Sequence, residues 1–387
     1  MYRIGQEELE AVKRVFESRY LFRIDAPFKE AEQFEKEWAY TIGTKYCLAL
    51  SGGTNALISA LVGMEVGPGD EVIIPSYTFM ATGIAVLAVG AIPVVAEIDE
   101  SLTIDTESIR EKISQYTKAI IPVHINGFPC NMDEIIHIAK EHNLMVLEDA
   151  CQADGGGYNG KRLGSIGDAG TFSFNHFKIL SAGEGGALVT DNRNIYERAL
   201  IYHDGGTAFR PYASELSVPV FTGNQHRISE ITGAILRVQH SRLETILYDL
   251  RAKKKAIQDS VPLETIPSYD IEGDCGSTIC FLFNNESQAR VFSEKIGPFG
   301  WLPIDSDKHV YKNWTPILNK RGGPSDYFNP YLMKENRGRQ MELKSDSCPK
   351  SLNLLSRTVC ISVKPDWSEQ ELANISSICI KSAGELS

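Results

Sequence analysis

The sequence lacks any hydrophobic run long enough to cross a membrane. Its longest apolar stretch, residues 83–96, has 14 residues and contains Gly90 and Pro93, whereas a bilayer crossing needs about 20. The amino end carries Glu7 and Glu8 where a secretory signal would place a basic and then an apolar run. We therefore expect no membrane span and a cytosolic location.

Basic runs and metal-binding motifs are also missing. The 387 residues include 39 Lys and Arg against 50 Asp and Glu, a net charge of −11, and such a chain repels a phosphate backbone on average. The eight cysteines show no paired C-x-x-C spacing, and the eight histidines form no H-E-x-x-H pair. Nucleic acid and metal are thus not expected ligands. Several cysteines sit in apolar runs, where reduced cysteine acts as a small core residue.

What the sequence does contain is an alternation of short β-branched runs and longer helical patterns, which is typical of α/β proteins. The mass of 42.9 kDa, with 43% apolar and 23% charged residues, favours two domains. Continuous apolar strands joined by helices predict a mostly parallel sheet covered on both faces, with ligands at the carboxyl ends of its strands. The expected strands are 46–50, 71–74, 92–98, 119–125 and 144–147, and the expected helices are 55–64, 78–89 and 132–142.

The pattern changes after Arg227. Residues 234–261 contain neither Gly nor Pro and place apolar side chains near helical spacing, which predicts one connecting helix. After Pro262, short strands and turn-rich loops indicate a smaller α+β domain. We place the boundary inside the connecting helix, with a large domain over residues 1–245 and a small domain over residues 246–387.

One segment at an expected strand end could bind an anion. Residues 51–57 turn from strand to helix through Gly52 and Gly53, and they offer backbone N–H groups, the Thr54 hydroxyl and a positive helix end to a phosphate. The dinucleotide and P-loop spacings are missing here. A glycine turn that only joins strand to helix is the alternative.

Two further segments carry candidate catalytic groups. A polar loop, residues 222–230, comes before the connecting helix. Asp149 ends a buried strand, where an acid is costly unless it meets a cation such as a protonated heterocyclic nitrogen; capping of the next turn is the alternative. Lys178 lies in an apolar, glycine-flanked setting that could lower its pKa and free its amine for Schiff-base chemistry. A solvated lysine is the alternative.

Together, these segments resemble the sugar aminotransferases of the DegT/DnrJ/EryC1/StrS family. The most diagnostic run is Glu148-Asp149-Ala150-Cys151-Gln152, followed by Ser173-Phe174, by Lys178 at 29 residues after Asp149, and by Glu184-Gly185-Gly186. The resemblance covers almost the whole chain. It implies an enzyme dependent on pyridoxal 5′-phosphate (PLP) with the aspartate aminotransferase-like fold (fold type I), in which the large domain holds a mostly parallel seven-stranded sheet.

The resemblance also implies roles for the matching residues. Lys178 would form the internal aldimine with PLP and move the proton between the substrate carbon and the cofactor, and Asp149 would pair with the pyridine nitrogen and keep it protonated. Gln152 would lie near the 3′-hydroxyl of the ring, and Phe79 would stack on its face. Arg227 matches the family's loop without an assigned role. The phosphate would be held by Gly53, Thr54, Ser173 and, from the second subunit of an obligate homodimer with shared sites, Asn224.

The predicted reaction moves an amino group from L-glutamate to a keto or aldehyde sugar. Residues 309–314 and 354–358 resemble the branch that aminates C8 of a free 3-deoxy-octulosonate, so the acceptor is either that sugar acid or a nucleotide-linked sugar. Some relatives carry histidine in place of the Schiff-base lysine and catalyse dehydration, whereas this chain keeps Lys178. A PLP-dependent dehydratase and a non-catalytic binding or regulatory protein are the alternatives.

Two neighbouring features have open interpretations. His176, two residues before the lysine, is either a hydrogen-bonded structural residue or a catalytic one. Residues 18–23 replace the turn that many relatives carry after the first helix, and they place Arg19 and Arg23 beside the expected substrate entrance. These arginines either meet an anionic sugar or are solvated.

Overall fold

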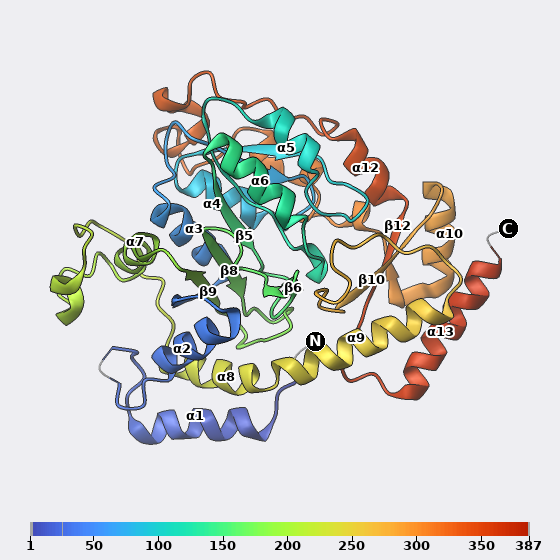
Figure 1. Cartoon of the computed structure of the whole chain (residues 1–387), viewed down its shortest axis with the longest axis horizontal. Helices are drawn as coiled ribbons and strands as arrows, with labels where there is room; N and C mark the ends of the chain where they lie inside the picture. Colours follow the sequence, from blue (N-terminus) through green and yellow to red (C-terminus); the bar gives the residue numbers. More distant parts are fainter. Residues whose placement is uncertain (1–2, 25, 386–387) are drawn as a thin grey trace.

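A seven-stranded sheet forms the centre of the molecule (Figure 1). The structure is a computed structural model that describes residues 3–24 and 26–385. The strand order is β1-β9-β8-β5-β4-β2-β3; β9 runs antiparallel to both neighbours, and the other neighbouring pairs are parallel. The predicted α/β fold with a mostly parallel seven-stranded sheet is therefore confirmed. The strands are β1 (Tyr46–Leu50), β2 (Glu71–Pro75), β3 (Ile92–Ala96), β4 (Thr117–Ile120), β5 (Met145–Asp149), β8 (Ala169–Ser173) and β9 (Gly186–Thr190).

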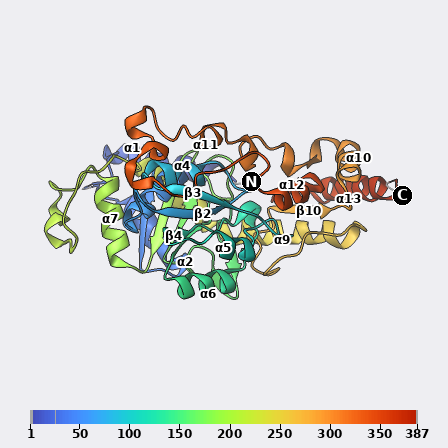
Figure 2. The same cartoon turned by 90° about the horizontal axis from the view of Figure 1, so that it is seen from above.

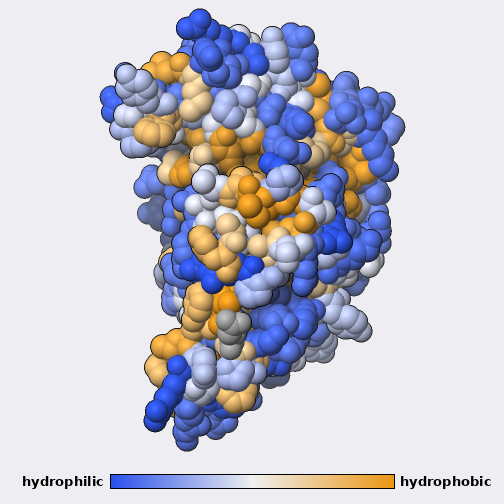
Figure 3. Space-filling view, turned by 90° about the vertical axis from the view of Figure 1, so that its left-hand side faces the viewer, coloured by the Kyte–Doolittle hydropathy of each residue, from blue (hydrophilic) through white to orange (hydrophobic). Residues whose placement is uncertain are grey.

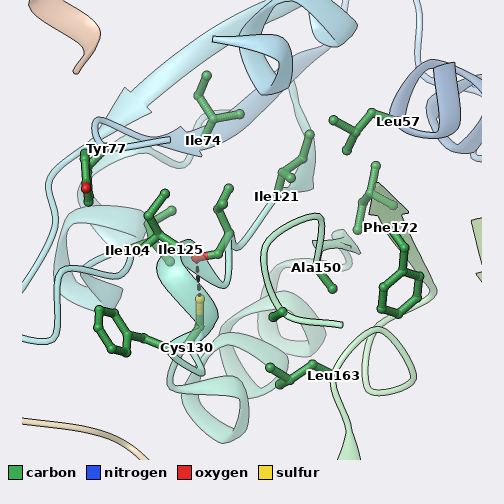
Figure 4. Packing of buried hydrophobic residues seen from close by; sticks show 14 of the residues in the cluster. Leu57, Ile74, Tyr77, Ile104, Ile121, Ile125, Cys130, Ala150, Leu163 and Phe172 are labelled. Carbon is green, nitrogen blue, oxygen red and sulfur yellow. Dashed lines mark hydrogen bonds between the residues drawn. The ribbon is translucent and has the colours of Figure 1, made fainter. Parts of the chain in front are cut away.

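Helices cover both faces of this sheet. In Figure 2, α5 and α6 lie on one side of β2, β3 and β4, and α4 lies on the other. Strands β2, β3, β8 and β9 are buried at every position, as expected for strands that helices cover on both faces. Leu57, Ile74 and Ala150, from a helix, a strand and a loop, belong to the resulting core (Figure 4). The helices are α3 (Gly53–Gly63), α4 (Ala81–Ala88), α5 (Thr106–Lys112), α6 (Met132–His142) and α7 (Arg193–His203).

Most predicted elements occur, with shifts that have local causes. The helix predicted over 132–142 is found with these bounds as α6. The strand predicted over 119–125 is wrong in its second half, because β4 ends at Ile120 and Pro122 has no N–H to donate to a continued ladder. Residues Ile125–Gly127 form a 3₁₀ turn instead.

The single connecting helix predicted over 234–261 is wrong, because the structure has two helices there. Helix α8 (Glu230–Ser241) and helix α9 (Leu243–Ser260) meet at Arg242. The Arg242 guanidinium donates to the Glu8 carboxylate at 2.6 Å and to the Arg3 carbonyl at 2.9 Å. A long-range contact with the amino-terminal helix α1 (Gln6–Ser18) therefore accompanies the break. Figure 1 shows α8 and α9 running in succession along one edge of the molecule, with α1 beside α8.

Helix α2 (Glu30–Ile42) supports the strand that precedes the lysine loop. The indole of Trp38 meets the rings of Phe172 and Phe174 edge to face, at centroid distances of 5.1 and 5.4 Å. Phe34 is also fully buried against Phe174. Such aromatic pairs add to the free energy of burial, so the carboxyl end of β8 rests on a rigid support.

The carboxyl-terminal part forms a second, smaller sheet and then returns to the large one. An antiparallel sheet is made by β10 (Thr278–Leu282), β12 (Thr358–Ser362) and β11 (Gly300–Trp301), packed with helices α10 (Glu286–Ile296), α12 (Pro349–Ser356) and α13 (Glu369–Gly384). Between β11 and α12, helix α11 (Thr315–Leu318) places Ile317 beside Gly83 of α4, and Asn336 donates to the Gly90 carbonyl at 2.9 Å. A short hairpin, β6 (Gly157–Tyr158) and β7 (Lys161–Arg162), completes the strands. The domain boundary at residue 245 stays a prediction.

The structure can be compared with two expectations from the sequence, which concern the state of the cysteines and the lack of a membrane span. All eight cysteines are free, and seven of them are buried. Among the helices of residues 3–24 and 26–385, none combines the length and hydropathy that crossing a bilayer requires.

Candidate active site

Three of the predicted segments meet at the carboxyl ends of β1, β5 and β8. A Cβ atom added to Gly53 would lie 2.8 Å from Cβ of Ser173 and 2.9 Å from Sγ of Cys151. These contacts leave no space for a side chain at the first residue of α3. The structure therefore brings together the start of α3, the end of β8 and the turn after β5.

The start of α3 offers unpaired backbone donors. Gly52 precedes the helix, and no side chain caps it. The first N–H groups of a helix have no intrahelical acceptor, and together with the helix dipole they bind anions such as phosphate. Thr54 lies half-buried in this first turn, and Ser173 is buried beside Gly53. The cradle therefore suits the phosphate of PLP.

The two acids of the diagnostic run serve different parts of the structure. Glu148 is fully buried and accepts N–H groups from Gly164, Ile166 and Gly167 at 2.6–2.8 Å. Its carboxylate also lies 3.1 Å from Nε2 of His124. Because neighbouring strand residues point to opposite faces, Glu148 holds the loop after β7, while the next residue is free to face the site.

Asp149 is held in place by two donors. Its carboxylate is 5% exposed; one oxygen accepts the Thr82 hydroxyl at 2.8 Å, and the other accepts the Cys151 N–H at 3.2 Å. Thr82 is itself 2.8 Å from the Thr78 hydroxyl. A carboxylate has about four acceptor positions, so each oxygen keeps one for a further donor. This fits the nitrogen of a protonated ring.

Lys178 lies half-buried in the loop between β8 and β9. Backbone hydrogen bonds close this loop at several levels, including Phe174 N–H to Gly185 O at 2.8 Å and His176 N–H to Gly183 O at 3.0 Å. Gly183 has a φ of +83°, a conformation that favours glycine. The lysine is thus presented by a fixed hairpin, and its positive charge acts on Cys151 of the neighbouring turn.

Gln152 is also fixed on one side only. Its Oε1 accepts the Asn126 N–H at 3.0 Å. Asn126 sits in a left-handed turn (φ 55°), and its carbonyl accepts the Ser277 hydroxyl at 2.8 Å. The amide NH₂ of Gln152 therefore remains as a donor toward the site.

Phe79 lines the entrance together with residues from the carboxyl-terminal part. Its ring is 39% exposed and lies 5.6 Å from the His309 ring. The ammonium of Lys308 stands 5.7 Å from the centroids of both Phe79 and Phe177. Burial lowers the pKa of His309 to about 4, with further lowering by the charges of Lys178 and Lys308. The segment around 309 thus reaches the lysine and carries a neutral imidazole there.

Asn224 does not join the other predicted residues within this chain. It is exposed, and its amide donates to the Tyr202 hydroxyl at the end of α7 at 2.8 Å. Arg227 pairs with the buried Asp204 carboxylate, and its guanidinium lies 5.3 Å from the Phe22 ring. Arg227 is therefore a structural ion-pair partner in this structure.

The arginines near residue 20 also differ in their surroundings. Arg23 is half-buried, and one of its nitrogens contacts both oxygens of Glu35 at 2.8 Å. Arg19 is exposed and ends α1 in a left-handed conformation. Arg23 also donates to the Ala49 carbonyl of β1 at 3.3 Å. The ring of His176 packs edge-on against Phe177 at 5.3 Å.

Sequence reasoning missed several residues that the fold adds to the site. Thr82 and His309 approach from a helix and from the carboxyl-terminal part, and Asp154 is a buried acid beside the lysine. Asp154 lies only five residues after Asp149. An acid repeated in the same turn is the one signal that could have drawn attention to it.

The fold and site together define a class of protein. A lysine on a fixed loop, a buried carboxylate and an uncapped helix start, all at one edge of a mostly parallel sheet, are the parts that a PLP enzyme of fold type I requires.

Comparisons with known proteins agree with this class. The family model of the DegT/DnrJ/EryC1/StrS aminotransferase family matches residues 2–267. The dTDP-3-amino-3,6-dideoxy-alpha-D-galactopyranose transaminase of Aneurinibacillus thermoaerophilus is 40% identical over 390 residues, which cover 96% of this chain and 94% of that protein. The spore coat polysaccharide biosynthesis protein SpsC of Bacillus subtilis (strain 168) is 30% identical over 382 residues, which cover 96% of this chain and 93% of that protein.

A solved structure agrees over the same length. The aminotransferase from Psychrobacter cryohalolentis has a TM-score of 0.79 and 26% identity, and the match covers 100% of this chain and 99% of that one. The chain belongs to the DegT/DnrJ/EryC1/StrS aminotransferase family. It is a PLP-dependent sugar aminotransferase.

Proposed function

We propose that the enzyme transfers the amino group of L-glutamate to a keto or aldehyde sugar at the site formed by Lys178, Asp149 and the start of α3. The observation that carries this proposal is the convergence at Cys151. Its N–H binds Asp149, its thiol borders Gly53, and the charge of Lys178 acts on it. Glutamate would leave as 2-oxoglutarate before the sugar enters the same site.

Each residue has a task that its surroundings support. Bound PLP supplies an electron-withdrawing ring that stabilises negative charge on the substrate carbon. Asp149, held by Thr82 and Cys151, keeps the ring nitrogen protonated, and Lys178 moves the proton at the reacting carbon. Phe79 would cover a ring face, and the NH₂ of Gln152 would be the donor near the ring's 3′-hydroxyl. The phosphate is held by Gly53, Thr54 and Ser173.

Covalent labelling tests the lysine assignment. Borohydride treatment of the yellow holoenzyme should bleach it and fix the cofactor on Lys178, as mapped by mass spectrometry. Lys178→Ala should retain no label, whereas Lys161→Ala, which alters an exposed lysine of β7, should label like the wild type. A label on any other lysine would contradict the proposed site.

The entrance supports an acceptor with negative charge. Lys308 extends over the rings of Phe79 and Phe177, and a cation on an apolar surface attracts an anion more strongly than one in bulk water. Nucleotide-linked keto sugars and a free octulosonate both meet this requirement. Incubating the pyridoxamine form of the enzyme with a panel of both types, and with neutral keto sugars, should show conversion only with an anion. Conversion of the neutral sugars at equal rates would contradict this proposal.

The proposed assembly is a homodimer in which Asn224 completes the partner's site. The side of the molecule that carries the loop after α7 displays hydrophobic patches between polar ones (Figure 3). Exposed large apolar residues include Phe209 at 83% and Phe177 at 69%. Exposed apolar patches commonly mark protein interfaces, and this supports association of two copies.

A further inference from the structure

Helix α9 and the segment that leads into β10 border a cavity of about 370 Å³. This volume lies in the range of about 300–1,000 Å³ that is typical of small-molecule sites. Four polar residues of α9 line the cavity, and their spacing by three or four positions puts them on one face of the helix: Arg251, Lys254, Lys255 and Gln258. None of the lining residues that the structure describes belongs to the proposed active site. The proposed reaction therefore leaves this cavity without a role.

A buried ion pair shapes the cationic wall of the cavity. Nζ of Lys254 lies 2.6 Å from Oδ2 of Asp274, and the two side chains are only 13% and 6% exposed. The other oxygen of Asp274 accepts the Gly276 N–H at 2.6 Å. The ammonium of Lys254 also lies 4.7 Å from the centroid of the Phe128 ring. Both oxygens of Asp274 are thus occupied, and the two charges of this pair offset each other.

Arg251 keeps its positive charge without a carboxylate beside it. Its Nε donates to the Asp274 carbonyl at 2.7 Å, which fixes the half-buried guanidinium at the cavity wall. Within the part of the chain that the structure describes, Arg251 forms no ion pair, and its two terminal nitrogens have no hydrogen-bond partner. The nitrogens of a guanidinium form a planar fork that matches the oxygens of a phosphate. This side chain is therefore placed to bind an anion that enters the cavity.

The cavity carries a local excess of positive charge. Lys255 extends the cationic face, and its partner is Asp259 at 3.1 Å in an exposed pair, which is a kind of contact that contributes little. Besides Asp274, the lining contains the acid Glu272, which is exposed. Three cations thus stand against two acids in the lining, in a chain whose net charge is −11. A recess of this kind raises the local concentration of anions.

The opposite wall of the cavity is mostly apolar. Ile266, Pro267 and Ile271 line it from the segment before β10, and the buried ring of Phe128 adds to them. The side chain of Ile271 is 76% exposed, and covering such a side chain with an apolar group is favourable. The cavity therefore offers cations on one side and an apolar surface on the other.

We propose that this cavity is a second binding site, which takes a nucleotide. The phosphate groups would contact Arg251 and Lys255, and the base would pack against the apolar wall. An inorganic anion would leave the apolar wall uncovered, and a neutral molecule would leave the Arg251 guanidinium without a charged partner. The two surfaces together therefore select a small molecule that carries both phosphate and a ring. This inference goes beyond the aminotransferase reaction and does not rest on it.

Titration calorimetry on the PLP-loaded enzyme tests the site. ADP and UDP serve as probes with different bases, and inorganic pyrophosphate supplies a similar charge without a ring. The nucleotides should bind, and pyrophosphate should bind more weakly. Lys255→Glu should weaken nucleotide binding about tenfold or more, because it turns an attraction into a repulsion. Lys253→Glu is the matched control, because it makes the same change of charge on α9 outside the cavity lining.

Hydrogen exchange measured by mass spectrometry locates the nucleotide without any variant. Residues 251–258 and 265–276 of the wild-type enzyme should exchange more slowly when ADP is present. Absence of binding by both nucleotides, equal affinity for pyrophosphate, or equal weakening by Lys253→Glu and Lys255→Glu would overturn the proposal. Slower exchange of the lysine loop, residues 174–185, in place of the cavity segments would assign the nucleotide to the proposed active site and overturn it as well.

Discussion

At the scale of single residues, function depends on how a few polar groups are held. Asp149 binds Thr82 and Cys151, while its sequence neighbour Glu148 satisfies a loop on the other side of the strand. Alternation along β5 explains why one acid faces the site and the adjacent one does not. The free lone pairs of Asp149 are thereby aimed at one place.

Thr82→Val should weaken catalysis more than folding. The change removes the hydroxyl that donates to Asp149 at 2.8 Å, and a hydrogen bond to a charged group contributes about 1.5–3 kcal/mol. The rate of amino transfer should fall roughly 10- to 100-fold. Single-turnover conversion with glutamate measures this effect, and Thr82→Ser, which keeps the hydroxyl, is the control. An unchanged rate in Thr82→Val would mean that Asp149 needs no such support.

At the scale of elements, α2 and α8 are joined at a point where side chains are excluded. The Glu230 carboxylate of α8 accepts the Glu30 N–H at 2.6 Å and the Ala31 N–H at 3.2 Å, and so caps the start of α2. A Cβ atom on Gly233 would lie 2.5 Å from the Ala31 nitrogen. Because α2 carries the Trp38 cluster behind β8, this contact indirectly supports the lysine loop.

Gly233→Ala should therefore destabilise the protein. The added methyl group meets backbone atoms that cannot rotate away, and such overpacking costs about 1–3 kcal/mol. Thermal and urea unfolding should both show lower stability. Gly67→Ala is the control, because a Cβ atom there would lie 3.8 Å from the Val89 carbonyl oxygen, which is an ordinary contact distance. Equal stability of the Gly233 variant and the wild type would show that the two helices are not held at this contact.

At the scale of the whole molecule, buried histidines link stability to pH. Burial lowers the pKa of His203 to about 3 and that of His309 to about 4, and nearby arginine or lysine charges add to both shifts. In the unfolded chain, histidine takes up its proton near pH 6.5. The folded protein keeps both rings neutral well below that pH, so protonation favours the unfolded state.

The stability that these two histidines contribute should thus be fully present above pH 6.5 and fall as the pH drops toward 4. Each histidine should contribute a slope of about 1.4 kcal/mol per pH unit in this window. Urea unfolding of the wild type and of His309→Gln at pH 7, 6 and 5 tests this expectation, and the variant should lose less stability on acidification. The exposed His137 provides the control as His137→Gln. Parallel slopes for the wild type and His309→Gln would contradict it.

Mixed dimers can test whether Asn224 acts across the subunit boundary. Lys178→Ala and Asn224→Ala should each be inactive or weak alone. If Asn224 serves the partner's site, a mixed dimer contains one intact site, so random mixing should restore about a quarter of the wild-type rate. Gln225→Ala is the control, because it removes the neighbouring amide side chain, which is also exposed. No recovery on mixing, with mixed dimers verified by tags, would mean that Asn224 serves its own chain or no site.

The diagnostic run and the lysine at its fixed distance carried the resemblance that predicted the family, the cofactor and the fold, because members of the family share these residue types in that order. Strands such as β2 were predictable because helices bury both of their faces, which leaves a continuous apolar run. The break at Arg242 was not predictable from the sequence, since a guanidinium that binds the distant Glu8 leaves no signal in the residues around the break.

The sequence by itself thus determined which groups the chain owns: a lysine, an acid that ends a strand, and a glycine turn before a helix. Only the tertiary structure decided that Thr82, Asp154 and His309 join them, because contacts between distant segments depend on how the layers pack. It also decided that Arg23 and Arg227 pair with acids inside the fold. Burial makes an unpaired charge costly, and the pairing of each charge is settled only when the chain is folded.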